Sequence, residues 1–186
     1  MKNSILSILL FLIFTGCSTV KIKQGTTVDA AQPSDAEVYF SKQETWLLGY
    51  FNPDRLTQEP YSSWYVKGFE VYQTDTVAIN KLMEINKDSL SLKVVMGTWC
   101  PDSRREVPRF MKIMDIWKFP VSKITFIGVD NEKLSPMGEY SKLDIQRVPT
   151  FIIFRNNIEA GRIIENPTTS LEQDLVNILY SVNNNK

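Results

Sequence analysis

The chain has 186 residues, of which 43% are hydrophobic, and its 21 Lys and Arg side chains balance 21 Asp and Glu side chains. This composition is typical of a folded protein with one main domain, and the absence of net charge and of basic clusters excludes the electrostatic surface that nucleic-acid binding requires. The sequence contains no histidine, which excludes Cys-His and Ser-His-Asp nucleophilic sites, so we expect no metal and no cofactor.

The first 16 residues are predicted to be a secretory signal peptide. An apolar run over residues 5–14 follows a basic residue and is about half the length of about 20 residues that a membrane-spanning helix needs. Phe14, Thr15, Gly16 and Cys17 resemble a bacterial lipobox, with Phe14 in place of the preferred leucine. The resemblance implies lipidation of Cys17 and a lipid-anchored protein of the bacterial cell envelope that faces the periplasm. A cysteine that only ends the removed signal is the alternative.

Two segments are predicted between the signal and the main domain. Residues 17–34 are polar and lack a sustained period, as in a flexible tether between a lipid and a folded domain. A helical extension is predicted over residues 35–60, because Ser34 and Glu37 match a capping box and Trp46 and Tyr50 recur at a spacing that a helix allows. The helix itself is expected to end at Tyr50.

The main domain is predicted over residues 61–186. In chain order we expect an extended segment over 61–72, a helix over 74–86, a strand over 90–96, a helix from residue 100, a strand over 124–129, a short helix over 137–143, strands over 150–154 and 158–164, and a final helix after 167. Asn156 and Asn157 mark a hairpin turn. The hairpin strands are antiparallel and the first two strands are joined by a crossover helix, so an α/β fold with a central mixed sheet flanked by helices is predicted.

Cys100 lies where a strand turns directly into a helix. Pro101 suits the first helical position, and a thiol at a helix start meets unpaired backbone N–H groups that stabilise its thiolate. Arg104 and Arg105 add positive charge in the first turn and Asp102 opposes it, so the sequence leaves the net sign open. Ser103 is expected either to donate a hydrogen bond to the sulfur or to help cap the helix. We therefore predict a reactive, solvent-accessible thiol.

Three motifs follow one another along the chain: Trp99-Cys100-Pro101-Asp102-Ser103, Pro108 within the same helix, and Val148-Pro149-Thr150. In this order they resemble the thioredoxin superfamily, and more specifically its bacterial thioredoxin-like lipoproteins. The resemblance implies a thioredoxin-like sandwich, a cis peptide bond before Pro149 and a loop that lies beside Cys100. It also implies catalytic roles for Cys100 and Ser103, and substrate-binding roles for Trp99, Pro101, Val148, Pro149 and Thr150.

The chain departs from the family pattern at two positions. Ser103 stands where the second cysteine of the pair is expected, and Val94 stands where many members carry a buried acid that assists proton transfer. A monothiol thiol-disulfide oxidoreductase is therefore predicted, acting on a protein or a low-molecular-weight thiol or disulfide and relying on an external resolving thiol. The alternatives are a redox-inactive binding module that holds a peptide or an envelope protein at the cis-proline face, and an inert buried cysteine.

Overall fold

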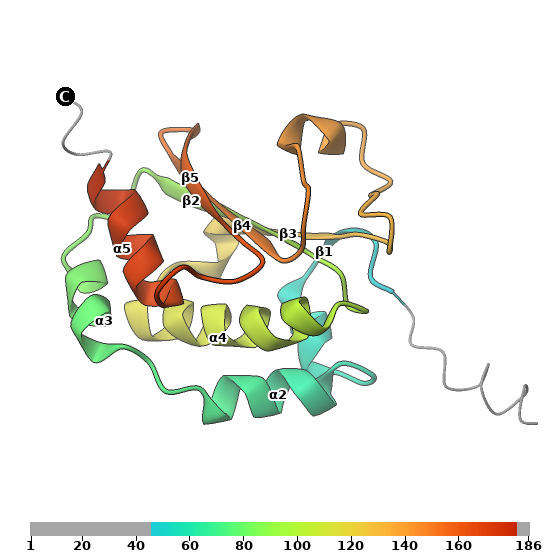
Figure 1. Ribbon diagram of the computed structural model, residues 1–186, viewed down its shortest axis with the longest axis horizontal. Helices are drawn as coiled ribbons and strands as arrows, with labels where there is room; N and C mark the ends of the chain where they lie inside the picture. Colours follow the sequence, from blue (N-terminus) through green and yellow to red (C-terminus); the bar gives the residue numbers. More distant parts are fainter. Residues whose placement is uncertain (1–45, 182–186) are drawn as a thin grey trace, which may run out of the picture. The chain divides into compact units, whose positions relative to one another are not determined.

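The computed structural model describes residues 46–181, whose core is a five-stranded mixed sheet (Figure 1). The predicted signal peptide over 1–16, Cys17, the tether over 17–34 and the predicted helix up to residue 45 lie outside the described residues. The strand order is β1-β3-β2-β4-β5. The strands are β1 (Gly49–Phe51), β2 (Leu90–Met96), β3 (Ile124–Gly128), β4 (Thr150–Arg155) and β5 (Ile158–Ile164).

The pairing of the strands follows from their connections. β2 and β3 run parallel because a helix crosses between them, whereas β4 and β5 form an antiparallel hairpin. Asn156 and Asn157 make the hairpin turn with φ angles of 52° and 63°, the left-handed values that a two-residue turn of this type requires. The predicted mixed sheet is confirmed.

The four α-helices of the described residues gather on one face of the sheet (Figure 1). They are α2 (Ser62–Val71), α3 (Thr76–Met83), α4 (Pro101–Trp117) and α5 (Leu171–Ser181). Three short 3-10 helices accompany them: η1 (Pro53–Thr57), η2 (Val121–Lys123) and η3 (Tyr140–Leu143). α4 lies directly on the sheet and α2 packs outside α4, where Gly68 permits the approach because a Cβ there would lie 2.7 Å from Pro108.

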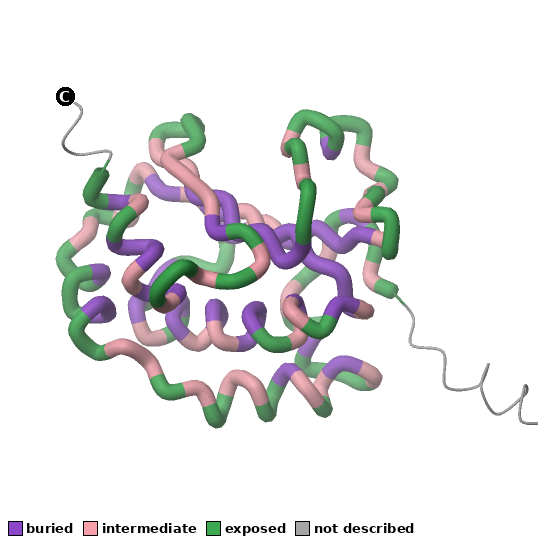
Figure 2. Tube along the Cα trace, viewed as in Figure 1, coloured by how far each residue is buried: buried purple, intermediate pink, exposed green. Residues whose placement is uncertain are grey.

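Much of the sheet is buried (Figure 2). Strand alternation divides its buried side chains into two clusters on opposite faces. On the helical face, Leu92, Val94 and Met96 of β2 join the buried residues of all four α-helices. On the other face, Val95 joins a smaller cluster that contains Cys100 and is covered by the segment around η3. Cys100 thus lies at the edge of the smaller cluster.

The helix predicted to reach Tyr50 is wrong in its described part. Residues 46–48 are irregular, and Gly49–Phe51 form β1, which pairs antiparallel with β3. Trp46, Leu48 and Tyr50 are exposed while the residues between them are more buried, an alternation of period two that indicates a strand. Because β1 belongs to the sheet, the described part of the extension predicted over 35–60 is part of the same folded domain.

The extended segment predicted over residues 61–72 is also wrong, because Ser62–Val71 form α2. Tyr61, Trp64 and Tyr65 recur three and four positions apart, and Tyr61 and Tyr65 are buried. This spacing places aromatic rings on one helix face. The rings meet edge to face, with centroids 6.4 Å apart for Tyr61 and Trp64 and 6.0 Å apart for Trp64 and Tyr65.

Candidate functional site

Cys100 occupies the N-cap of α4, directly after the turn that leaves β2. Its backbone is extended, with φ −80° and ψ 124°, and its N–H donates to the carbonyl of Gly97 at 3.0 Å. Gly97 has a steric reason to lack a side chain, because a Cβ there would lie 2.5 Å from the Trp99 indole. Pro101 takes the first helical position, as predicted.

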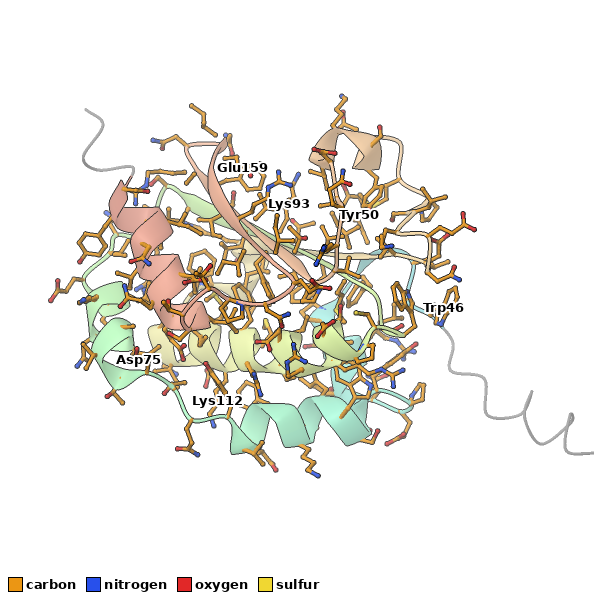
Figure 3. All side chains as sticks on the ribbon, in the orientation of Figure 1. Trp46, Tyr50, Asp75, Lys93, Lys112 and Glu159 are labelled. Atoms are coloured by element: carbon orange, nitrogen blue, oxygen red, sulfur yellow. The ribbon has the colours of Figure 1, made fainter. Side chains whose placement is uncertain are left out.

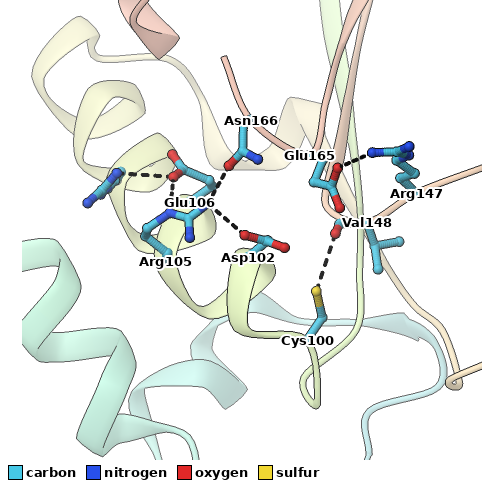
Figure 4. A network of polar contacts seen from close by, with 9 residues as sticks. Cys100, Asp102, Arg105, Glu106, Arg147, Val148, Glu165 and Asn166 are labelled. Carbon is cyan, nitrogen blue, oxygen red and sulfur yellow. Dashed lines mark hydrogen bonds and ion pairs between the residues drawn. The ribbon is translucent and has the colours of Figure 1, made fainter. Parts of the chain in front are cut away.

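The thiol of Cys100 lies beside the loop that precedes β4 (Figure 4). Its S–H donates to the carbonyl oxygen of Val148 at 3.3 Å, and the Val148–Pro149 peptide bond is cis. Both expectations for this loop are confirmed. The expectation of an accessible thiol is wrong: Cys100 is only 6% exposed, because the turn and the loop close over it.

Ser103 neither donates a hydrogen bond to the Cys100 sulfur nor caps the helix, which were the two roles predicted for it. Its hydroxyl oxygen accepts a hydrogen bond from the Gly97 N–H at 3.3 Å, and the side chain is completely buried. Within residues 46–181, no hydrogen bond joins it to the Cys100 sulfur. Ser103 therefore ties the first turn of α4 back to the end of β2.

A pocket of about 490 Å³ opens beside the thiol. Of the residues predicted to contact substrate, Trp99, Pro101 and Val148 line it together with Cys100. Sequence reasoning missed its other lining residues, which are Asp102, Asn131, Lys133, Gln146, Arg147 and Glu165. Asp102 belongs to the first turn of α4. The other five come from the segment between β3 and β4 and from the end of β5, which carry no recognisable motif.

Pro149 and Thr150 lie behind the pocket wall. The Pro149 carbonyl accepts from the N–H of Glu165 at 2.7 Å, and the buried Thr150 hydroxyl donates to the carbonyl of Arg147 at 2.7 Å. Arg147 in turn pairs with the Glu165 carboxylate at 2.7 Å (Figure 4). These contacts fix the loop that presents Val148 to the thiol, so both residues position the site.

The two arginines of the first turn are engaged elsewhere. Arg104 donates from Nε to the carbonyl of Thr98 at 2.6 Å, and burial lowers the pKa of its guanidinium. Arg105 pairs with Glu106 at 2.6 Å and with Asp102 at 2.7 Å, and these carboxylates, Glu106 foremost, raise the pKa of Arg105 (Figure 4). The charge of Arg105 is balanced locally by these two carboxylates, whereas the start of α4 presents unpaired backbone N–H groups to the sulfur.

Glu106 organises this side of α4. Its Oε1 atom accepts from Arg105 and also from Arg109 at 3.0 Å, while its buried Oε2 has no hydrogen-bond partner within residues 46–181. A buried carboxylate that holds two half-exposed guanidinium groups keeps them along the helix surface. No sequence motif indicated this role.

Val94 is fully buried and is paired in the sheet with Phe126 and Phe151. The position that could hold a proton-relaying acid is therefore part of the apolar core. Within residues 46–181 there is no group of three or more His, Cys, Asp or Glu side chains that could hold a metal ion. The same residues include no helix that is both long and apolar enough to cross a bilayer.

No family model matches the chain. Thioredoxin H9 of Arabidopsis thaliana is 27% identical over 107 residues, which cover 55% of this chain and 70% of that thioredoxin. Among solved structures, a protein of unknown function from Pseudomonas aeruginosa aligns with 69% of this chain and 87% of its own, at a TM-score of 0.49 and 12% identity. A thioredoxin from Trypanosoma brucei brucei aligns with 59% of this chain and 88% of its own, at a TM-score of 0.35 and 26% identity.

The topology and the site agree with the sequence similarity to thioredoxin H9. The mixed sheet has its crossover helix between β2 and β3, and that helix begins at a cysteine. The cysteine thiol meets the residue before a cis-proline. The domain has a thioredoxin-like fold.

Proposed function

We propose that this protein exchanges thiols and disulfides through Cys100 alone and depends on an external thiol to complete each cycle. The observation that carries the proposal is the environment of the sulfur, which lies at a helix N-terminus, beside a cis-proline loop and next to a pocket. The only other cysteine in the sequence is Cys17. Ser103, in the position of a second thiol, is buried and faces Gly97.

The proposed reaction has two balanced steps. The Cys100 thiol first loses its proton to solvent, and the thiolate attacks one sulfur of a substrate disulfide, forming a mixed disulfide and releasing the other sulfur as a thiolate. An external thiolate then attacks the mixed disulfide, forms a new disulfide with the substrate sulfur and regenerates the Cys100 thiolate. No hydroxyl can perform this second step, so Ser103 cannot replace the external thiol.

The Val148 carbonyl gives the substrate a place to bind. In the described state this oxygen accepts the Cys100 S–H. A thiolate carries no proton to donate, so deprotonation of Cys100 frees the carbonyl to accept an N–H from an extended peptide. Loss of the thiol proton and binding of a peptide backbone are thereby coupled. A protein substrate fits this coupling.

A second candidate function is a redox-inactive module that binds a peptide or an envelope protein at the cis-proline face. It is favoured by the low exposure of Cys100, which is 6%, and by the engagement of its thiol with Val148. Such a module would use the same pocket without covalent chemistry. The two candidates differ in whether a sulfur–sulfur bond to Cys100 ever forms.

Purification from the native cell without reductant, followed by mass spectrometry of the peptide that contains Cys100, separates these functions. The monothiol mechanism predicts a disulfide-linked adduct that disappears on reduction, because nothing in the chain can resolve it. The adduct also identifies the physiological substrate. Partners that co-purify with unmodified Cys100, and with a Cys100→Ser variant as well, would support the binding module instead.

The proposed setting is the bacterial cell envelope, with the protein anchored through a lipid on Cys17. The basis is the short apolar run that ends at the lipobox-like Phe14-Thr15-Gly16-Cys17. Metabolic labelling with a fatty acid is expected to tag the protein, and a Cys17→Ser variant is expected to lose the label completely. A Cys100→Ser variant is the matched control and should label like the wild type. Equal labelling of the Cys17→Ser variant would refute the anchor.

A further inference from the structure

We infer that residues 46–48, which lead into β1, position the turn that carries Cys100 and limit access to its thiol. This inference rests on the proposed function of Cys100, and it assigns positioning roles to Trp46 and Leu47. Figure 3 labels Trp46 where the described chain begins and Tyr50 further along β1. Leu47 and Trp46 each contact the turn, and Leu47 also lies against the end of β3.

Leu47 joins the turn to the end of β3. Its N–H donates to the hydroxyl oxygen of Thr98 at 3.3 Å. Its carbonyl oxygen lies against Gly128, where a Cβ would come within 2.0 Å of it. No residue other than glycine fits at Gly128 while the segment keeps this place. The backbone of Leu47 is therefore held on both sides.

Thr98 receives this contact inside the protein. The residue is 1% exposed, and its carbonyl accepts the Nε–H of Arg104 at 2.6 Å. Thr98 is thus held by Leu47 through its side chain and by α4 through its backbone. Only Trp99 separates it from Cys100 in the chain, so the position of Thr98 sets the path of the turn into Cys100.

Trp46 supports the next residue of the turn. Its ring lies 6.4 Å from the ring of Trp99, at an interplanar angle of 54°. The Trp99 indole also donates to the carbonyl of Val129 at 3.0 Å and lies over Gly97. Trp99 lines the pocket beside Cys100 and packs against the cluster that contains it. Trp46 therefore stabilises one wall of the thiol site from outside.

Through these contacts, residues 46–48 affect access to the Cys100 thiol without touching it. Cys100 is only 6% exposed, so a reagent or a substrate reaches it more readily when the surrounding turn or loop opens locally. The frequency of opening depends on the contacts that hold the turn closed, and the contacts of residues 46–48 are among them. Weakening those contacts should increase access without unfolding the sheet.

The test is the rate at which iodoacetamide modifies Cys100 in the full-length folded chain, read by mass spectrometry of its peptide so that Cys17 does not contribute. A Trp46→Ala variant should react about threefold to tenfold faster than the wild type, as expected for the loss of one aromatic pair. Thr98→Val, which removes the acceptor of the Leu47 N–H, should give a smaller rise. Trp46→Phe retains a ring and should restore a rate near that of the wild type.

Tyr50→Ala is the matched control. Tyr50 lies in β1, directly after residues 46–48, and is 65% exposed, and no ring contact or hydrogen bond links it to the turn within residues 46–181. Its replacement should leave the modification rate unchanged. A rise in this variant equal to that of Trp46→Ala would mean that any change in β1 suffices, which would overturn the inference.

The dependence of the rate on urea separates local positioning from a general loss of stability. Local opening exposes little surface, so the rate for Trp46→Ala should vary weakly with urea well below the unfolding transition. A rate that follows global unfolding, an unchanged or slower rate, or no modification in any variant would overturn the inference. Because iodoacetamide needs no disulfide exchange, the proposed function can fail while this inference holds, and the reverse.

Discussion

Replacing Ser103 with Cys is expected to turn a poor reductant of insulin disulfides into an active one. Residues three apart in the first turn of a helix lie on one face, so a thiol at position 103 can reach a mixed disulfide on Cys100. The wild type should stay near the background rate of insulin reduction by small thiols, and Ser103→Cys should exceed it by at least about tenfold. The gain is limited because Val94 supplies no proton relay.

Two controls make this experiment decisive. Ser103→Ala removes the hydroxyl that accepts from Gly97 without adding a thiol, so it should remain at background activity. A double variant with Cys100→Ser and Ser103→Cys should also be inactive, because the thiol that starts the reaction is gone. A wild type as active as Ser103→Cys would contradict the requirement for an external resolving thiol.

Phe110→Ala is expected to cause the largest loss of stability. Phe110 of α4 stacks on Phe151 of β4 at 4.4 Å, and both side chains are fully buried between the helix and the sheet. Truncation of a buried phenylalanine leaves a cavity and typically costs about 3–5 kcal/mol of unfolding free energy. Urea denaturation followed by circular dichroism measures the change.

Phe154→Ala is the matched control for this prediction. Phe154 also belongs to β4, but it lies on the opposite face, is only partly buried, and has the Lys93 ammonium 5.2 Å from its ring. Its truncation should destabilise the protein much less than that of Phe110. Equal losses in the two variants would contradict the assignment of the main core to the helical face.

The strands and helices with a strong local pattern could be predicted from the sequence. β2 has the predicted bounds, Leu90–Met96, and β5 has the predicted bounds, Ile158–Ile164. The long apolar stripe also identified α4, in spite of the buried Pro108 inside it. In these elements the period of the hydrophobic residues and the turn residues at the ends indicate the same structure.

The two wrong predictions of secondary structure, a helix that reaches Tyr50 and an extended segment over 61–72, both concern aromatic residues. In each case the spacing of these residues was interpreted as that of the wrong type of element. Trp46 and Tyr50 are four residues apart, a spacing that fits both a helix and one face of a strand, and the intervening exposed Leu48 decides for the strand. In α2 the error was the opposite, since Tyr61, Trp64 and Tyr65 have helical spacing although aromatic residues favour strands.

The sequence was sufficient to predict which residues form the thiol site, but not how buried the thiol is. Cys100 at a helix start could be predicted from its local sequence, and the cis-proline after Val148 was implied by the resemblance to the thioredoxin superfamily. The burial of the thiol could not, since it depends on residues distant in the chain, and Leu47 is 51 positions from its partner Thr98. The carboxylates that neutralise Arg105 were visible in the sequence, but their geometry was not.

The most direct test of the monothiol mechanism is to follow the formation and release of a mixed disulfide on Cys100. The purified wild type is mixed with a stoichiometric amount of a small symmetrical disulfide, and intact-mass spectrometry counts the adducts on Cys100. We expect one adduct per chain, stable until an excess of small thiol is added and then released completely, with none at position 100 in the Cys100→Ser variant. Failure of the folded wild type to form the adduct, or its release without added thiol, would contradict the mechanism.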